Sequence, residues 1–196
     1  YILGKNAPTT FYTGSLIYEQ LTNNLQYSKS FSDKAKSVLK LGFGGDWRLE
    51  HYQIKEGEEA SWKNYYPSGT KQGGSGGLVL SPIDAIKESR NVLAAYVETE
   101  MEFAKRFLAD IALRYEYYSD YGSNLAGKLA ARYKLGDKFL ARGSISNGFR
   151  APSLQQRYYS HTRVGILSGI QVVQGIFRNN SPVAAALDIP SLQPEK

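Results

Sequence analysis

The sequence predicts an all-β fold in which antiparallel strands follow one another as an up-and-down meander. Three observations predict it: apolar and polar residues alternate over long stretches, helical periodicity is scarce, and short turn-like segments separate the alternating stretches. The turn-like segments cover residues 32–35, 104–106 and 136–138. They are short enough to join neighbouring antiparallel strands as hairpins.

Six long strands are expected, over residues 10–28, 37–54, 91–104, 107–119, 124–135 and 138–149. The remaining connections are a long insertion at 55–90, a small turn at 120–123 and a long tail at 150–196 with little strand pattern. Within the tail, Ser181 and Pro182 predict the start of a short helix. Short turns therefore gather at one end of the sheet and the longest loops at the other, as in outer-membrane barrels.

The alternation separates charged from uncharged residues. In five of the six strands every Asp, Glu, Lys and Arg stands at an even-numbered position, while residues such as Leu41, Val97, Ile111 and Leu129 occupy the odd-numbered ones. Successive side chains of a strand point to opposite faces of the sheet, so one face is charged and the other is not. The first strand is less regular, because Glu19 breaks its pattern.

The uncharged face can cover the core of a soluble β-protein or can face lipid. The expected strands are much longer than the roughly 5–6 residues usual in soluble proteins, and a tilted membrane strand needs about 9–11. Phe103, Phe107, Tyr133 and Phe139 flank two of the short turns, as an interfacial aromatic belt does. The opposite face is too polar for a dry core, and ion pairs between acidic and basic strands are expected there. These details favour lipid.

Composition excludes several functions. The chain has 196 residues and a net charge of +6, with no Cys and two His, which excludes thiolate metal sites and leaves little room for a His cluster. The sequence contains no run of about 18 apolar residues, so no transmembrane helix is expected. The glycine-rich run at 73–77 lacks the Lys of a phosphate loop. No nucleophile, base and orienting group come together, so we expect neither an enzyme, a cofactor nor a bound metal, and no nucleic-acid partner.

A segment after the sixth strand resembles TonB-dependent outer-membrane receptors. It reads Ser146-Asn147-Gly148-Phe149-Arg150-Ala151-Pro152-Ser153-Leu154, and similar matches occur in order at residues 45–50, 113–123 and 192–195. The resemblance implies a large transmembrane β-barrel of about 22 strands around an N-terminal plug domain. Six strands are fewer than the roughly eight of the smallest membrane barrel. Residues 1–196 are therefore expected to be a partial barrel with long external loops at 55–90 and 150–196, and with the plug domain not present.

The resemblance also implies function: import of a large, scarce ligand, either a siderophore, haem, cobalamin or a glycan, across the bacterial outer membrane. Its implied partners are membrane lipid, the plug of the same chain, the TonB complex acting through that plug, and the ligand. Two alternatives stay open, a passive porin-like barrel and a soluble lipocalin-like binding module.

Candidate site residues fall into two groups, and each has a plainer explanation. External-loop residues are expected to bind ligand, or else only to pack the loops: Trp62, Tyr65, Tyr66, Tyr121, Arg150, Tyr158, Tyr159 and His161. Arg150 in particular can serve to structure its own loop. Charged residues of the barrel lumen are expected to contact the plug, or else water and one another: Arg48, Glu50, Glu98, Glu100, Glu102, Arg114, Glu116, Lys128, Arg132 and Arg142.

Overall fold

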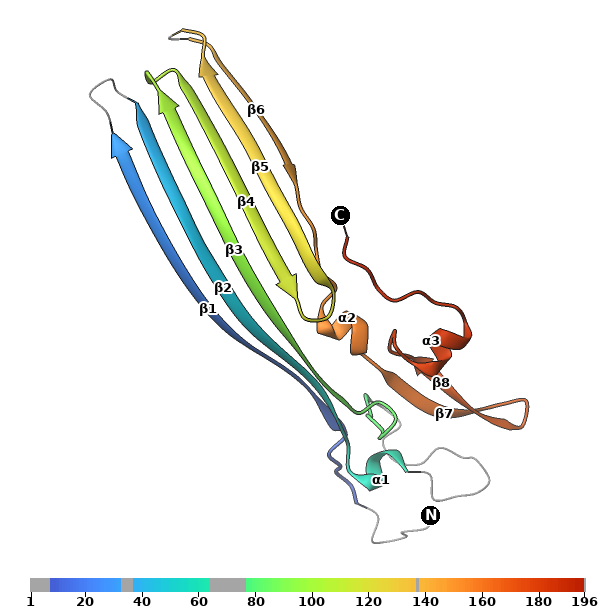
Figure 1. Cartoon of the computed structure of the whole chain (residues 1–196). Helices are drawn as coiled ribbons and strands as arrows, with labels where there is room; N and C mark the ends of the chain where they lie inside the picture. Colours follow the sequence, from blue (N-terminus) through green and yellow to red (C-terminus); the bar gives the residue numbers. More distant parts are fainter. Residues whose placement is uncertain (1–7, 33–36, 64–76, 137, 196) are drawn as a thin grey trace. The chain divides into compact units, whose positions relative to one another are not determined.

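A single sheet of six strands dominates the computed structural model, which describes residues 8–32, 37–63, 77–136 and 138–195. Each strand pairs with its neighbours in sequence and runs opposite to them (Figure 1). This confirms the antiparallel meander. The strands are β1 (Gly14–Ser32), β2 (Val38–Glu56), β3 (Ile86–Phe103), β4 (Phe107–Tyr118), β5 (Gly122–Lys134) and β6 (Leu140–Asn147).

Two strands differ from the expected bounds. β1 begins and ends four residues later than the expected 10–28, and β3 begins at Ile86 instead of residue 91. Both strands continue beyond the stretch of strict alternation, because backbone pairing with β2 extends the ladder where the side-chain pattern has faded. The turn between β4 and β5 is correspondingly residues 119–121.

The expectation that the tail holds little strand structure was wrong. Two strands, β7 (His161–Leu167) and β8 (Ile170–Ile176), form a separate hairpin. Its turn consists of Ser168 and Gly169, whose φ angles are 51° and 80°. Two further short helices, α1 (Glu59–Trp62) and α2 (Leu154–Tyr158), were not expected. The expected helix after Ser181 is confirmed as α3 (Pro182–Ala186), with the Ser181 hydroxyl accepting a hydrogen bond from the Ala184 amide at 3.1 Å.

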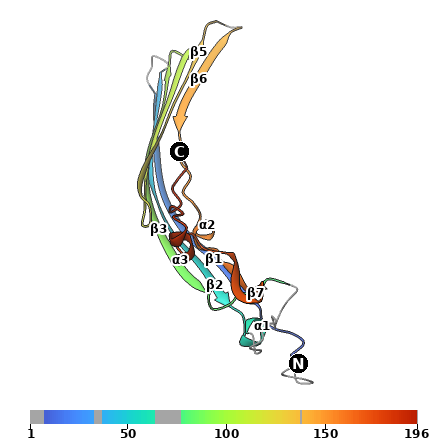
Figure 2. The same cartoon turned by 90° about the vertical axis from the view of Figure 1, so that its right-hand side faces the viewer.

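The chain divides into two compact units. We call Gln20–Leu49, Arg90–Ala151 and Gln193–Lys196 the wall unit, and Tyr1–Glu19, Glu50–Ser89 and Pro152–Leu192 the loop unit. In the edge-on view of Figure 2, β5 and β6 of the wall unit form a single curved layer. The three helices of the described residues lie in the loop unit, and none of them is long and apolar enough to cross a membrane.

The register of the wall unit keeps its two faces separate across four strands. Val97 pairs with Leu113, and Ile111 pairs with Leu129, which in turn pairs with Ile145. Odd-numbered residues thus stand beside odd-numbered residues from β3 to β6. Because a shift of one residue would move every side chain to the other face, this register is what builds one continuous apolar surface.

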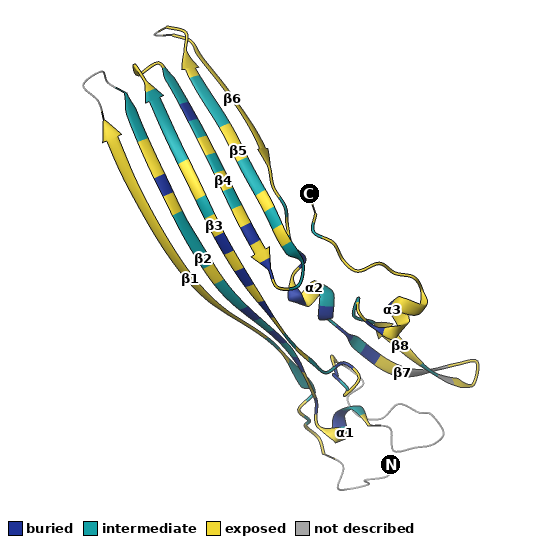
Figure 3. Cartoon of the chain, viewed as in Figure 1, coloured by how far each residue is buried: buried dark blue, intermediate teal, exposed yellow. Residues whose placement is uncertain are grey.

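The apolar face of the wall unit is not a core. Leu41, Val97, Ile111 and Leu129 are 37%, 47%, 36% and 50% exposed, and Figure 3 shows exposed positions recurring along each wall strand. A soluble protein rarely leaves such a large contiguous apolar surface open to water. The exposure agrees with a face that lipid covers.

Aromatic residues mark two levels of this apolar face. Tyr27, Phe31, Phe103 and Tyr133 are exposed near the short turns, and Trp47, Tyr115 and Tyr117 are exposed toward the other end. Along β4, ten residues separate Phe107 from Tyr117. At about 3.4 Å per residue and a tilt of about 40°, that separation spans about 25 Å, the height of the apolar band of outer-membrane barrels.

The loop unit has a small core of its own. Tyr52, Ile54, Leu80, Leu154 and Tyr158 are buried together. α2 supplies two of them, and it begins with a capping box in which the Ser153 hydroxyl accepts from the Gln156 amide while the Gln156 side chain accepts from the Ser153 amide. Such a cap fixes where the short helix starts, and so positions Leu154 and Tyr158 toward the core.

Candidate functional site

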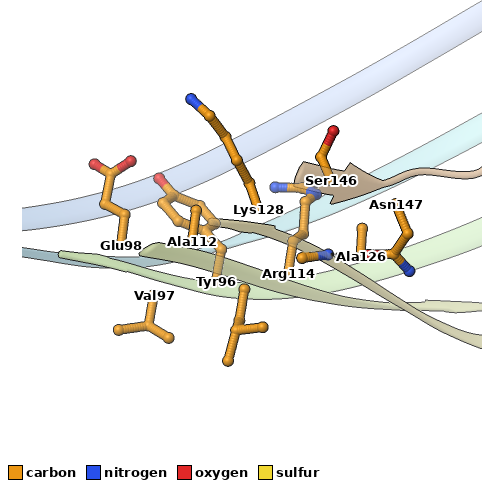
Figure 4. A pocket seen from close by; sticks show the side chains of 11 residues that line it. Tyr96, Val97, Glu98, Ala112, Arg114, Ala126, Lys128, Ser146 and Asn147 are labelled. Atoms are coloured by element: carbon orange, nitrogen blue, oxygen red, sulfur yellow. Dashed lines mark hydrogen bonds between the residues drawn. The ribbon is translucent and has the colours of Figure 1, made fainter. Parts of the chain in front are cut away.

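The charged face of the wall unit is built by the same alternation that builds the apolar face. In Figure 4 the neighbours Val97 and Glu98 on β3 point to opposite sides of the sheet, and Lys128 and Ser146 lie on the side of Glu98. The even-numbered residues therefore share one surface. If the apolar face meets lipid, this surface lines the interior of the barrel.

Ion pairs connect neighbouring strands across this surface. Lys40 Nζ on β2 lies 2.7 Å from Glu100 Oε1 on β3, and Lys128 Nζ on β5 lies 3.1 Å from Asp110 Oδ2 on β4. These contacts confirm the expected cross-strand pairing of acidic with basic residues. Both pairs are open to solvent, which screens their attraction, so they add little to stability. Their main effect is that four of the wall charges already have partners within the barrel.

Arg114 is the centre of a denser network. Its Nη2 lies 2.7 Å from Asp46 Oδ2, and its Nε lies 2.5 Å from Glu116 Oε1. Glu116 is buried and accepts a second hydrogen bond from the Tyr118 hydroxyl at 2.9 Å. The Arg114 guanidinium also lies 5.6 Å from the centre of the Tyr96 ring. A planar guanidinium with two carboxylate partners holds its neighbours in fixed positions better than a Lys would.

Arg90, a buried cation of the wall unit, was not among the residues expected from the sequence. Arg90 is 4% exposed, lies 3.7 Å from Asp120 and stacks over the rings of Tyr118 and Tyr121 at 5.3 and 6.0 Å. It was assigned to the insertion because β3 was expected to start one residue later. Its even position in the sequence was the available signal, because even-numbered residues of β3 share one face of the sheet. Val92 and Ala94 are the next residues on that face, and both are buried like Arg90.

The other lumen candidates are placed as follows. Arg48 of the wall unit is half-buried and Glu50 of the loop unit is buried, and both have interaction partners. Glu98 extends over Gly42, where its carboxylate would lie 2.8 Å from a Cβ. Glu102, Arg132 and Arg142 form no hydrogen bond or ion pair with the residues that the structure describes, and Arg142 is exposed on β6, the last wall strand.

The external-loop candidates differ in how much of each side chain is accessible. Trp62 in α1 donates its indole N–H to the Gly57 carbonyl at 3.0 Å, which leaves its ring half-exposed. Tyr158 is buried in the loop-unit core, and Tyr159 packs against that core. His161 is half-buried at the first position of β7. Tyr65 and Tyr66 lie outside the described residues.

Two candidates lie in the wall unit. Tyr121 is half-buried against Arg90 and the Tyr118 ring, from which its own ring lies 6.4 Å away. Arg150 exchanges two backbone hydrogen bonds of 3.0 Å with Glu195, while its side chain is exposed. The Arg150 backbone thus structures its own loop, and the guanidinium is available for other contacts.

A buried carboxylate organises the loop unit and had no sequence signal. Asp84 is fully buried and accepts five hydrogen bonds of 2.9–3.0 Å: two from Ser81, one from the Ser160 hydroxyl, and two from the amide and hydroxyl of Thr162. The donors on β7 and just before it are more than 70 residues away in sequence. Asp84 therefore fastens the turn at 81–84 to the base of the β7–β8 hairpin.

Comparison with known proteins identifies the family of this chain. A family model described as TonB dependent receptor-like, beta-barrel, matches residues 3–196. The chain belongs to this family. A TonB-dependent receptor segment of this kind is part of a large transmembrane β-barrel in the bacterial outer membrane, as the sequence analysis predicted, and is not a lipocalin-like module.

Named relatives of this TonB-dependent receptor segment are siderophore receptors. The curated ferric enterobactin receptor PirA of Pseudomonas aeruginosa is 32% identical over 105 residues, which are 50% of this chain and 14% of the relative. The crystal structure of the siderophore receptor PirA from Acinetobacter baumannii has a TM-score of 0.55 at 20% identity, covering 91% of this chain and 23% of that one.

The Pseudomonas aeruginosa siderophore receptor PirA structure has a TM-score of 0.51 at 20% identity, covering 84% of this chain and 27% of its own. At this identity the two structures support the fold of the TonB-dependent receptor segment and nothing finer. The segment spans about a seventh of the length of its curated relative.

Proposed function

We propose that the receptor containing this segment imports a ferric siderophore across the outer membrane by energy-coupled transport. The observation that carries the proposal is the 32% identity to a protein named a ferric enterobactin receptor. Both structural relatives are also named siderophore receptors. Among the ligands considered from the sequence, these names favour the iron chelate over haem, cobalamin or a glycan.

The wall unit supports transport through an aqueous interior. Ion pairs such as Asp46 with Arg114 cover the charged face, and this face would be costly against lipid tails. The opposite face exposes Leu, Ile and Val at the depth of the bilayer. A barrel closed from such strands has a wet lumen, which a large hydrophilic chelate can cross once the lumen is opened.

The loop candidates supply the chemistry that an iron chelate needs. A ferric chelate carries oxygen ligands and usually negative charge, so cationic and aromatic side chains at the external mouth suit it. Among the described candidates the Arg150 side chain is the exposed one, and the Trp62 ring is half-exposed. We include Tyr65, Tyr66, Tyr121, Tyr158, Tyr159 and His161 in the proposed ligand-binding set.

The proposed mechanism requires parts beyond this chain. We propose that residues 1–196 form one part of a larger barrel, that a plug of the same polypeptide fills its lumen, and that TonB acts on that plug. Of the ten lumen candidates, those without partners in the wall are the natural plug contacts. A passive porin-like barrel would need neither plug nor TonB.

The proposal is tested by uptake of a radiolabelled ferric siderophore into cells that carry the full-length receptor. Replacing Trp62, Tyr65 and Tyr66 together by Ala should lower ligand affinity about tenfold or more, because aromatic anchors dominate binding sites. Lys63→Ala, an exposed neighbour, is the matched control. Unchanged affinity of the triple variant would remove this loop from the site, and uptake that continues after an uncoupler is added would favour the passive barrel.

A further inference from the structure

The short turns of the wall unit carry a concentration of positive charge. They join β1 to β2, β3 to β4 and β5 to β6, so all three lie at one end of the sheet (Figure 1). Seven Lys and Arg and two Asp, a net charge of +5 in a chain of net charge +6, stand at this end in residues 29–36, 104–106 and 134–138. The much longer connections at the other end hold eight basic and seven acidic residues, in residues 55–85, 119–121 and 150–196.

The described cations of the turn end form what we call the basic rim: Lys29, Lys105, Arg106, Lys134 and Lys138. All five are exposed, and none forms an ion pair with an acidic residue that the structure describes. The Lys134 amide donates to the Arg106 carbonyl at 2.9 Å, so the end of β5 lies against the β3–β4 turn. The Leu135 amide donates to the Phe139 carbonyl at 3.0 Å and closes the β5–β6 turn. The backbone thus places four cations of the rim on adjoining turns.

The basic rim lies directly beside the aromatic level near the short turns. Lys105 and Arg106 stand between Phe103 and Phe107, whose stacked rings have their centres 6.1 Å apart. Aromatic rings on the outer surface of a membrane barrel lie at the level of the lipid headgroups. A Lys or Arg one or two residues beyond the rings, at about 3.4 Å per residue, can extend its charged end to the headgroup phosphates.

Lys29 indicates the side of the sheet on which the anion lies. It stands between Tyr27 and Phe31 on β1, and the Tyr27 ring lies 5.3 Å from that of Phe43, an exposed residue of the apolar face. Lys29 has the same parity as these aromatic residues, and its Nζ lies 5.1 Å from the centre of the Phe31 ring. An ammonium group on a lipid-facing surface extends to the headgroups, because it is costly deeper in the bilayer. The counter-ion of Lys29 therefore lies on the lipid side.

We infer that the basic rim binds anionic phospholipid headgroups of the periplasmic leaflet of the outer membrane. The short turns of outer-membrane barrels lie on the periplasmic side. Each Lys or Arg close to an anionic lipid surface adds to the attraction. Phosphatidylglycerol is favoured over phosphatidylcholine, because in the latter the choline group balances the charge of the phosphate. The inference concerns the barrel wall and does not depend on the ligand that the receptor imports.

Spin-labelled lipids in vesicles that contain the full-length receptor test the inference. Wild type should select labelled phosphatidylglycerol over labelled phosphatidylcholine about threefold or more. The preference should disappear in about 1 M salt, where charges are screened within about 3 Å. This salt titration uses the wild-type protein, so it stands whether or not a variant folds.

Two rim variants separate the effect of charge from that of side-chain shape. Lys29→Gln/Lys105→Gln/Arg106→Gln should lower the preference about twofold or more, because three of the cations are removed. Lys29→Arg/Lys105→Arg/Arg106→Lys keeps the charges and should keep the preference. The matched control is Lys55→Gln/Lys87→Gln/Arg163→Gln, which removes three exposed cations of the loop unit and should leave the preference unchanged.

Hydrogen exchange locates the contact in the same receptor. The Arg106 amide, which donates to the Phe103 carbonyl at 3.0 Å, should exchange more slowly in vesicles with phosphatidylglycerol than in phosphatidylcholine alone. Three results would overturn the inference: no lipid preference in wild type, a preference that the Gln rim variant retains in full, or an equal loss in the loop-unit control. The first would leave the rim to an acidic protein or polymer of the periplasm.

Discussion

Among the described glycines of the wall unit, Gly44 on β2 leaves the least room for a side chain. A Cβ at this position would lie 2.5 Å from the Tyr96 hydroxyl and 2.5 Å from the Leu25 carbonyl oxygen. The end of the Tyr96 side chain therefore occupies the position that a Cβ of residue 44 would need. Since the Leu25 contact is to backbone, relief would require β1 to move away from β2.

We expect Gly44→Ala to lower the free energy of unfolding of the full-length receptor by about 1–3 kcal/mol, the usual cost of overpacking. Urea titration of the receptor folded into lipid vesicles measures it. Gly143→Ala is the control, since a Cβ there meets nothing within 4 Å. Adding Tyr96→Ala should restore only part of the loss, and a full restoration would show that the Leu25 carbonyl does not matter.

Tyr52 is a second residue whose environment makes a sharp prediction. It lies in the loop-unit core, five residues beyond Trp47, is 3% exposed, and its hydroxyl has no hydrogen-bond partner among the described residues. A buried hydroxyl without a partner costs stability. Tyr52→Phe should therefore raise the free energy of unfolding by about 1 kcal/mol, whereas a decrease would show that the hydroxyl has a partner elsewhere in the receptor.

The same burial predicts a pH dependence. Burial raises the pKa of Tyr52 above its ordinary value of 10.0, so the unfolded chain releases this proton first. Stability from this group is complete below pH 10 and is lost as the pH rises through the raised pKa. The fall in unfolding free energy above pH 10 should be shallower in Tyr52→Phe than in wild type, which pH-dependent urea titration detects.

At the scale of elements, the β3–β4 turn places two residues in a left-handed backbone conformation that their side chains disfavour. Ala104 and Lys105 have φ angles of 49° and 59°, and the Arg106 amide donates to the Phe103 carbonyl at 3.0 Å. Two consecutive left-handed residues match the twist of a hairpin but favour Asn and Gly. Lys105→Gly should stabilise the receptor by about 1 kcal/mol. The exposed Lys138→Gly serves as control, and an equal gain there would point to lost charge instead of relieved strain.

The Asp84 cluster is the element-scale feature of the loop unit. Asp84→Ala leaves the amides of Ser81 and Thr162 and three hydroxyl donors without their shared acceptor, so the turn at 81–84 should detach from the β7–β8 hairpin. We expect loss of about 2–4 kcal/mol of local stability, seen as faster hydrogen exchange of residues 161–176. Ser160→Ala removes one of the five hydrogen bonds and should show a much smaller change. Equal exchange in both variants would contradict the assignment.

Strand bounds could be predicted from the sequence where the alternation of charged and uncharged side chains determines them. β2, β4, β5 and β6 lie within two residues of their expected bounds, because one face of each strand is free of charge. The β7–β8 hairpin and α2 were missed, although Ser168-Gly169 and the Ser153–Gln156 spacing were usable signals. Asp84 could not be predicted, since its partners Ser160 and Thr162 come close only after the loop unit has folded.

For the whole molecule, the two faces of the sheet should respond differently to the same substitution. Leu129 lies on the apolar face, midway between the two aromatic levels, and Ala130 follows it on the charged face beside Asp110. Leu129→Lys should cost about 2–4 kcal/mol of folding free energy in lipid, and Ala130→Lys about 0–1. Urea titration of full-length receptor in vesicles compares them, and similar costs would mean that lipid does not cover the Leu129 face.

The two aromatic levels also have a consequence for the membrane in which the receptor can work. An apolar band of about 25 Å is shorter than the hydrocarbon of an average bilayer, which is about 30 Å thick, and the bacterial outer membrane is thinner than average. Bilayers of longer acyl chains would have to thin around the barrel, at a cost that grows with each ångström of hydrophobic mismatch. The spacing of Phe107 and Tyr117 thereby helps to sort this protein to its own membrane.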